Sequence, residues 1–138
     1  MNTFKNSLCG RLRMSGKEEI RKHKEICDKI LALSPKIRYV GMINRFGKTV
    51  AGNLRKGIQP LFKPEQARDE FFLASVREFM RKDFNSTLGK IHFTLTVHDK
   101  VKIVSFVNND YTFYLSLEKD TSYGEIERIV EAASKMKM

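Results

Sequence analysis

The segment from Gly41 to Thr49 contains the residue types of a phosphate-binding loop, in which glycines, a lysine and a hydroxyl residue surround a nucleotide phosphate. In such a loop four residues separate the two glycines, whereas five residues separate Gly41 from Gly47 here. A phosphate-binding loop also leads into a helix whose N-terminus faces the phosphate. Here Thr49 begins a run that is typical of a strand, so both spacing and context argue against nucleotide binding.

A second candidate site consists of His23 and Cys27, which lie four residues apart and would share one face of a helix. Two such ligands could point at one metal ion, but a zinc site needs three or four ligands. No further pair of histidines or cysteines at ligand spacing completes the set, and His92 and His98 are interpreted as a strand-surface and a turn residue. The sequence therefore predicts no metal and no cofactor.

No nucleophile has the sequence context of a catalytic residue. The chain lacks the G-x-S-x-G pattern that exposes a serine nucleophile, and Cys9 has no base beside it at a fixed position. No pair of carboxylates stands out as a general acid and base. We therefore expect a protein that is not an enzyme and has no catalytic residues.

The segment from Arg45 to Lys48 is the most distinctive short feature, because it places an aromatic ring between two cations. Asn44 and Gly47 occupy the first and fourth positions of a predicted type I turn at the tip of a hairpin. There Phe46 could stack on a base or enter a groove of a partner, while the cations contact phosphates or carboxylates. Alternatively, Phe46 packs back onto the following helix. Candidate partner-binding or nucleic-acid-binding residues are Arg38, Arg45, Phe46, Lys48, Arg55 and Lys56, with Lys63 extending the same surface.

The net charge is concentrated in the N-terminal half of the chain. The 138 residues include 26 Lys and Arg against 16 Asp and Glu, a net charge of +10. Residues 29–64 contain eight basic and no acidic side chains, whereas residues 65–138 contain eleven basic and twelve acidic ones. Such a field concentrates anionic partners near the surface, so nucleic acid is an alternative partner for this half.

Length and composition set the protein class. A chain of this length is typical of one domain, and the sequence has no run of about 18 apolar residues that could span a membrane. The two cysteines form no disulfide framework, which favours a reduced, cytoplasmic protein. Residues 1–16 lack apolar periodicity and are predicted to form a flexible basic arm, followed by one domain over residues 17–138.

Hydrophobic periodicity in that domain predicts the order helix, two strands, helix, three strands, helix. The predicted helices span residues 17–33 and 64–84 and a segment that begins with a capping box at Ser122, and the predicted strands span residues 37–43, 48–52, 91–97, 101–107 and 111–117. This order indicates an α+β fold with a central five-stranded antiparallel sheet. We expect the middle helix on one face of the sheet and the terminal helices nearby.

The middle helix contains more apolar surface than one buried face requires. Its large apolar residues cover an arc of roughly 200°, about twice what a helix buried on one side needs. Either the sheet wraps around this helix or one flank meets a second protein chain. A predicted homodimer interface consists of Phe71, Leu73, Val76 and Met80.

The order of elements resembles the roadblock/dynein light chain family, whose domains share a longin-like and profilin-like architecture. The resemblance covers about residues 17–135. It rests on the helix before Pro35, the strand–turn–strand from Val40 to Ala51 with Asn44 and Gly47 at its bend, the long middle helix, the three-stranded meander and the closing helix. Residues 37–56 also resemble small archaeal proteins of this type.

The resemblance implies a non-catalytic module that dimerises, often through its middle helices and adjoining sheet edges, and that scaffolds or regulates small GTPases or motor complexes. The basic arm and the long loop over residues 53–63 depart from the family pattern. A profilin-like sensor of a small ligand would have the same order of elements. Three functions therefore stay open: a homodimeric interaction module, a nucleic-acid-binding protein and a small-ligand sensor.

Overall fold

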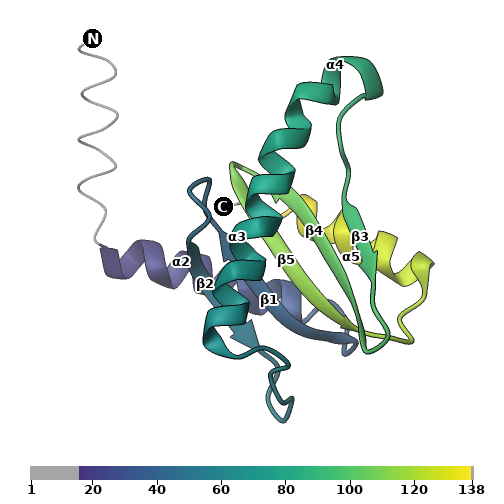
Figure 1. Cartoon of the computed structure of the whole chain (residues 1–138). Helices are drawn as coiled ribbons and strands as arrows, with labels where there is room; N and C mark the ends of the chain where they lie inside the picture. The colour runs from purple at the N-terminus through teal and green to yellow at the C-terminus, as the bar shows by residue number, and fades with distance from the viewer. Residues whose placement is uncertain (1–15, 138) are drawn as a thin grey trace.

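The computed structural model describes residues 16–137 and confirms the predicted order of elements (Figure 1). The predicted basic arm and Cys9 lie outside the described residues, apart from Gly16, which begins the first helix. Within residues 16–137 no helix is both long and apolar enough to cross a membrane. The elements are α2 (Gly16–Leu31), β1 (Ile37–Ile43), β2 (Thr49–Leu54), α3 (Pro64–Arg81), the 3-10 turn η1 (Lys82–Phe84), α4 (Asn85–Leu88), β3 (Thr94–Val97), β4 (Val101–Asn108), β5 (Tyr111–Glu118) and α5 (Tyr123–Ser134).

The five strands form one antiparallel sheet in the order β2-β1-β5-β4-β3. The hairpin β1–β2 and the meander β3–β4–β5 join through the pairing of β1 with β5, so both elements share one sheet as predicted. Strands β2 and β3 are the two edges. The most hydrophobic strand segments are therefore central, and the short strand β3 lies at an edge.

The two faces of the sheet are covered differently. Helices α2 and α5 lie on one face and enclose the main core, which includes Ile26, Ile30, Leu115, Ile126 and Val130. Helix α3 crosses the opposite face and contacts a smaller core (Figure 1). The terminal helices are thus on the side of the sheet away from the middle helix, an arrangement more specific than the sequence predicted.

The region after α3 differs in its bounds from the prediction. The helix ends at Arg81 instead of residue 84, and η1 and α4 continue the chain beyond the end of the sheet (Figure 1). Gly89 then adopts a φ of 86°, a left-handed conformation that terminates α4 and turns the chain back. Because residues 91–93 belong to this return segment, β3 begins only at Thr94.

The predicted capping box at the start of α5 is present in part. The Ser122 hydroxyl accepts a hydrogen bond from the Glu125 backbone N–H at 3.2 Å, as predicted. The Glu125 carboxylate, however, accepts from the Ser34 hydroxyl after α2 instead of from the cap backbone. This contact links the ends of α2 and α5, which are far apart in sequence.

The tip of the β1–β2 hairpin has the predicted turn. The Asn44 side chain accepts hydrogen bonds from the backbone N–H groups of Phe46 and Lys48, both at 3.0 Å. Gly47 has a φ of 81°, and a methyl group added to it would lie 2.3 Å from Phe72 Cδ2. The glycine is therefore required by its backbone conformation and by its close approach to α3.

We expect Gly47→Ala to lower the free energy of unfolding by about 2 kcal/mol, because the new methyl group is strained and overlaps the Phe72 ring. Gly57→Ala is the matched control, since Gly57 has a similar φ of 86° but no atom within 4 Å of an added carbon. This variant should lose only about 1 kcal/mol. Urea unfolding measures both values, and equal losses would show that the contact with Phe72 has no effect.

Candidate interaction surface

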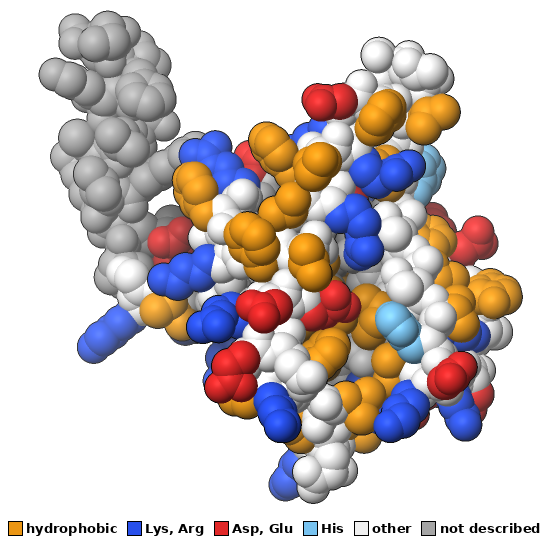
Figure 2. Space-filling view, in the orientation of Figure 1, with side chains coloured by type: hydrophobic (Ala, Val, Ile, Leu, Met, Phe, Trp, Pro, Cys, Tyr) orange, Lys and Arg blue, Asp and Glu red, His pale blue; other side chains and the backbone are white. Residues whose placement is uncertain are grey.

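Helix α3 presents a row of large apolar side chains to solvent. Phe72 is 49% exposed, Leu73 60%, Phe79 60% and Met80 63%, and Val76 is half-buried between them. These five residues recur at the three- and four-residue spacing of one helix face. We call them the α3 stripe, and Figure 2 shows hydrophobic side chains gathered along this helix on the face in view.

The side of α3 that faces the sheet contains mainly small or polar side chains. Most of the large apolar residues of the helix therefore lie on its outer side. The Ser75 hydroxyl donates to the Asn44 carbonyl at 3.1 Å, and the buried Glu78 carboxylate accepts from the Ser105 hydroxyl at 2.8 Å. Ala74 packs between these groups and the sheet. The helix is therefore held to its sheet by hydrogen bonds and one aromatic side chain.

That aromatic side chain is Phe71, which the sequence placed in the dimer interface. Phe71 is buried and stacks on Tyr39 at 5.5 Å between ring centroids, with Tyr114 at 4.7 Å. It therefore lies on the sheet side of α3, whereas Leu73 and Met80 lie on the outer side. The structure brings Leu73, Val76 and Met80 together on one face and separates Phe71 from them.

Phe72 and Phe79 are the members of the α3 stripe that the predicted interface omitted. Both belong to the wide apolar arc of the middle helix. The four-residue spacing of Phe72, Val76 and Met80 is the sequence feature that indicates a shared helix face. Beyond the helix end, Phe84 is a further exposed aromatic side chain, at 54%. The outer surface is thus larger than the sequence indicated.

The hairpin tip borders the N-terminal part of the α3 stripe. Phe46 is 74% exposed, so the alternative in which it packs back onto the helix is wrong. The Arg45 guanidinium lies 5.1 Å from the centre of the Phe46 ring. A hollow between the tip and α3 is lined by Phe46, Lys48, Arg68 and Phe72, among others. The tip therefore adds an aromatic ring and cations to the edge of the stripe.

The other predicted binding cations lie at the far end of the same hairpin and have internal partners. Arg55 donates to three backbone carbonyls, those of Leu31, Ser34 and Ile37, at 2.6 to 2.8 Å. Arg38 pairs with Glu118 at 3.0 Å and donates to the Gln59 carbonyl at 3.3 Å.

The length of strand β2 separates the two groups of cations. The six residues of β2 span about 20 Å at the usual strand rise, so the predicted cations do not form one continuous site. Lys56 is exposed beside Arg55. Nucleic-acid binding stays a prediction from the charge alone.

Three titratable side chains in the interior, those of Cys27, Tyr39 and Tyr114, have a raised pKa and are protonated at neutral pH. Burial raises the pKa of the Cys27 thiol to about 12 and that of the Tyr39 hydroxyl to about 12. Burial, followed by the hydrogen bond to Glu70, also raises the pKa of Tyr114. A neutral thiol is a poor nucleophile and metal ligand. Within residues 16–137 no three His, Cys, Asp or Glu side chains are grouped to hold a metal ion.

No protein-family model matches the sequence, and no curated protein matches it. Solved structures match its fold. The gliding protein MglB from Thermus thermophilus is similar over 80% of this chain and 82% of its own, with 14% identity and a TM-score of 0.64. MglB in a tetrameric arrangement matches over 80% and 81%, with 14% identity and a TM-score of 0.65. A Roadblock/LC7 domain from Streptomyces avermitilis matches over 79% and 92%, with 9% identity and a TM-score of 0.58.

At such low sequence identities, the similarity to these solved structures establishes the fold alone. The chain has the roadblock fold, with a five-stranded antiparallel sheet and helices on both of its faces. The resemblance to archaeal proteins stays a prediction.

Proposed function

We propose that this chain is a non-catalytic interaction module of the roadblock fold that forms a homodimer through the α3 stripe. The stripe is the observation on which the proposal depends. Together with Phe46 and Phe84 it presents on the order of 600 Å² of apolar surface, taking each large side chain as about half exposed. That is close to the roughly 800 Å² that each partner of a standard protein interface buries.

The fold offers a two-fold arrangement for this interface. Two copies of α3 packed antiparallel about Val76 would place Leu73 of one copy near Met80 of the other. The edge strand β3 has only β4 as a neighbour, so its free edge can pair with the same strand of a second copy. MglB, which has the same fold, occurs in a tetrameric arrangement, which is consistent with assembly.

The partner class follows from the roadblock resemblance, which implies a small GTPase or a related signalling complex. The exposed cations of the tip, Arg45 and Lys48, stay available beside the stripe for such a partner. The buried, reduced Cys27 is consistent with action in the cytoplasm. In this proposal the module positions its partner and transfers no group itself.

Light scattering of the purified protein tests the dimer directly. We expect a mass of twice the 16.0 kDa chain at tens of micromolar, because burial of the stripe is favourable at about 25 cal/mol per Å² before association costs. Dilution to the nanomolar range should reveal the monomer. A strict monomer at tens of micromolar would overturn the proposal.

A further inference from the structure

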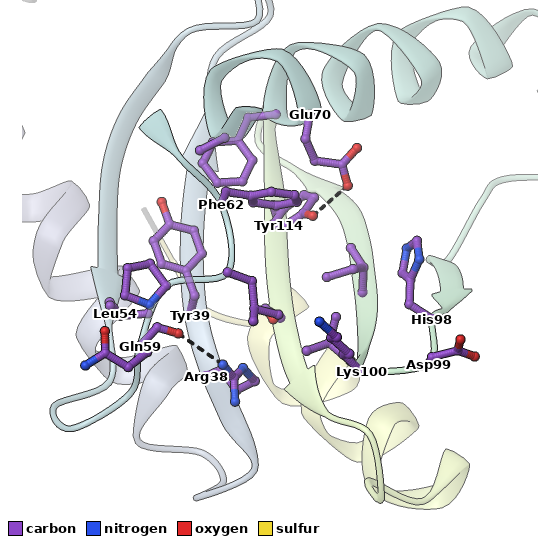
Figure 3. A pocket seen from close by; sticks show the side chains of 17 residues that line it. Arg38, Tyr39, Leu54, Gln59, Phe62, Glu70, His98, Asp99, Lys100 and Tyr114 are labelled. Carbon is purple, nitrogen blue, oxygen red and sulfur yellow. Dashed lines mark hydrogen bonds between the residues drawn. The ribbon is translucent and has the colours of Figure 1, made fainter. Parts of the chain in front are cut away.

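A cleft of about 610 Å³ opens beside α3, where the helix leaves part of the sheet uncovered (Figure 3). Strands β1, β4 and β5 form its floor, and the first half of α3 forms one wall. The loop over residues 59–62 and the turn over residues 98–100 form the lips on either side. Small-molecule sites in proteins are typically clefts of about 300 to 1,000 Å³, and this cleft falls within that range.

The lining of the cleft is mainly apolar. Tyr39, Phe71 and Tyr114 form a connected group of rings at one corner, with centroid distances of 5.5 and 4.7 Å. Val101 and Ile103 continue the apolar floor along β4. The lip that precedes α3 adds two partly exposed apolar side chains, those of Leu61 and Phe62. Such a lining favours a hydrophobic ligand body.

The polar groups lie at opposite ends of the cleft. At the α3 end, Glu70 accepts a hydrogen bond from the Tyr114 hydroxyl at 2.7 Å, so this end is negative. Arg38 lies at the other end, where its bonds to Glu118 and to the Gln59 carbonyl fix the guanidinium; its further N–H groups donate to no other residue within 16–137.

The turn between β3 and β4 adds a second cation to the Arg38 end. Lys100 lies on the cleft side of this turn, whereas the Asp99 carboxylate points away from the cleft (Figure 3). Within residues 16–137 Lys100 forms no ion pair. Because the charge of Arg38 is balanced by Glu118, Lys100 supplies the net positive charge of this end, and Arg38 adds hydrogen-bond donors opposite the carboxylate of Glu70.

We propose that this cleft binds a small apolar molecule with an anionic group at the end that reaches Arg38 and Lys100. The apolar body lies over Val101, Ile103 and the aromatic corner. The carboxylate of Glu70 repels an anion from the α3 end, which sets the direction of binding. The site is separate from the α3 stripe, so it does not depend on dimerisation.

Two fluorescent probes with the same aromatic body test this inference. Anilinonaphthalene sulfonate has an anionic group, whereas N-phenyl-1-naphthylamine lacks it. We expect Lys100→Glu to weaken binding of the sulfonate at least about tenfold, a loss of about 1.4 kcal/mol, and to change binding of the neutral probe less than twofold. Lys100 is on an exposed turn, so this variant should fold.

A second variant fills the cleft from α3. Ala67 lines the cleft on an early turn of the helix, so Ala67→Trp should abolish binding of both probes, while Ala67→Ser should retain both. Leu73→Glu/Met80→Glu should also retain both, because it alters only the stripe. Loss of binding in the stripe variant, or full binding in Ala67→Trp, would show that the probes bind elsewhere and would overturn the inference. Equal losses of the two probes in Lys100→Glu would overturn the anionic specificity.

Discussion

Replacing Leu73 and Met80 together with glutamate should convert the proposed homodimer into a folded monomer. In the antiparallel arrangement the two side chains of one copy face those of the other, so four carboxylates would be brought together in an apolar contact. Burying unpaired charges costs several kcal/mol, and we expect the dimer dissociation constant to rise at least 100-fold. Sedimentation velocity at tens of micromolar measures the shift, and circular dichroism checks that the monomer is folded.

The matched control is Ile20→Glu on α2, because Ile20 is 60% exposed, as Leu73 is, but lies on the opposite face of the sheet. This variant should stay dimeric.

The antiparallel arrangement of the two α3 helices has its own test. A mixture of the single variants Leu73→Glu and Met80→Lys should form heterodimers more readily than either variant forms homodimers. If the double glutamate variant stays dimeric, the stripe is not the interface.

Arg55→Met should destabilise the fold by about 3 kcal/mol, which lowers the melting temperature by roughly 10 °C. The Arg55 guanidinium is bonded to three carbonyls, one of them the terminal carbonyl of α2, where a positive charge also interacts favourably with the helix dipole. Methionine preserves much of the aliphatic length of arginine, but it donates no hydrogen bond to these partly buried carbonyl groups.

Lys56→Met is the neighbouring control, because Lys56 is exposed and has the same formal charge. We expect this variant to change the free energy of unfolding by less than about 0.5 kcal/mol. Thermal and urea unfolding of the two variants give the comparison. Equal stability of both would mean that Arg55 is not structural and would restore it as a candidate for partner binding.

The parts of the fold that depend on local sequence were predicted well. The bounds of β1 were correct, and Pro64 and Ser122 correctly predicted the first turns of α3 and α5. Asn44 and Gly47 predicted the hairpin turn, because its conformation requires a side-chain acceptor and a left-handed residue within four positions. Such signals depend on residues close in the chain and can be read without a tertiary structure.

The candidate site was predicted less completely, because it depends on contacts between distant residues. Arg55 counted as a free cation in the sequence, yet its acceptors lie 18 to 24 residues away. Phe71 is adjacent to Phe72 on the apolar arc, and only the position of Tyr39 and Tyr114 shows which ring faces the sheet. The cleft beside α3 combines residues of four strands, a helix and two loops, so no sequence window contains it.

The unequal covering of the two sheet faces has a consequence for how this protein can evolve. The packing that stabilises the domain is concentrated between the sheet and helices α2 and α5, whereas the α3 stripe and the cleft are on the other side. Substitutions on the α3 side can therefore change the proposed partner-binding and ligand-binding surfaces while the main core stays intact.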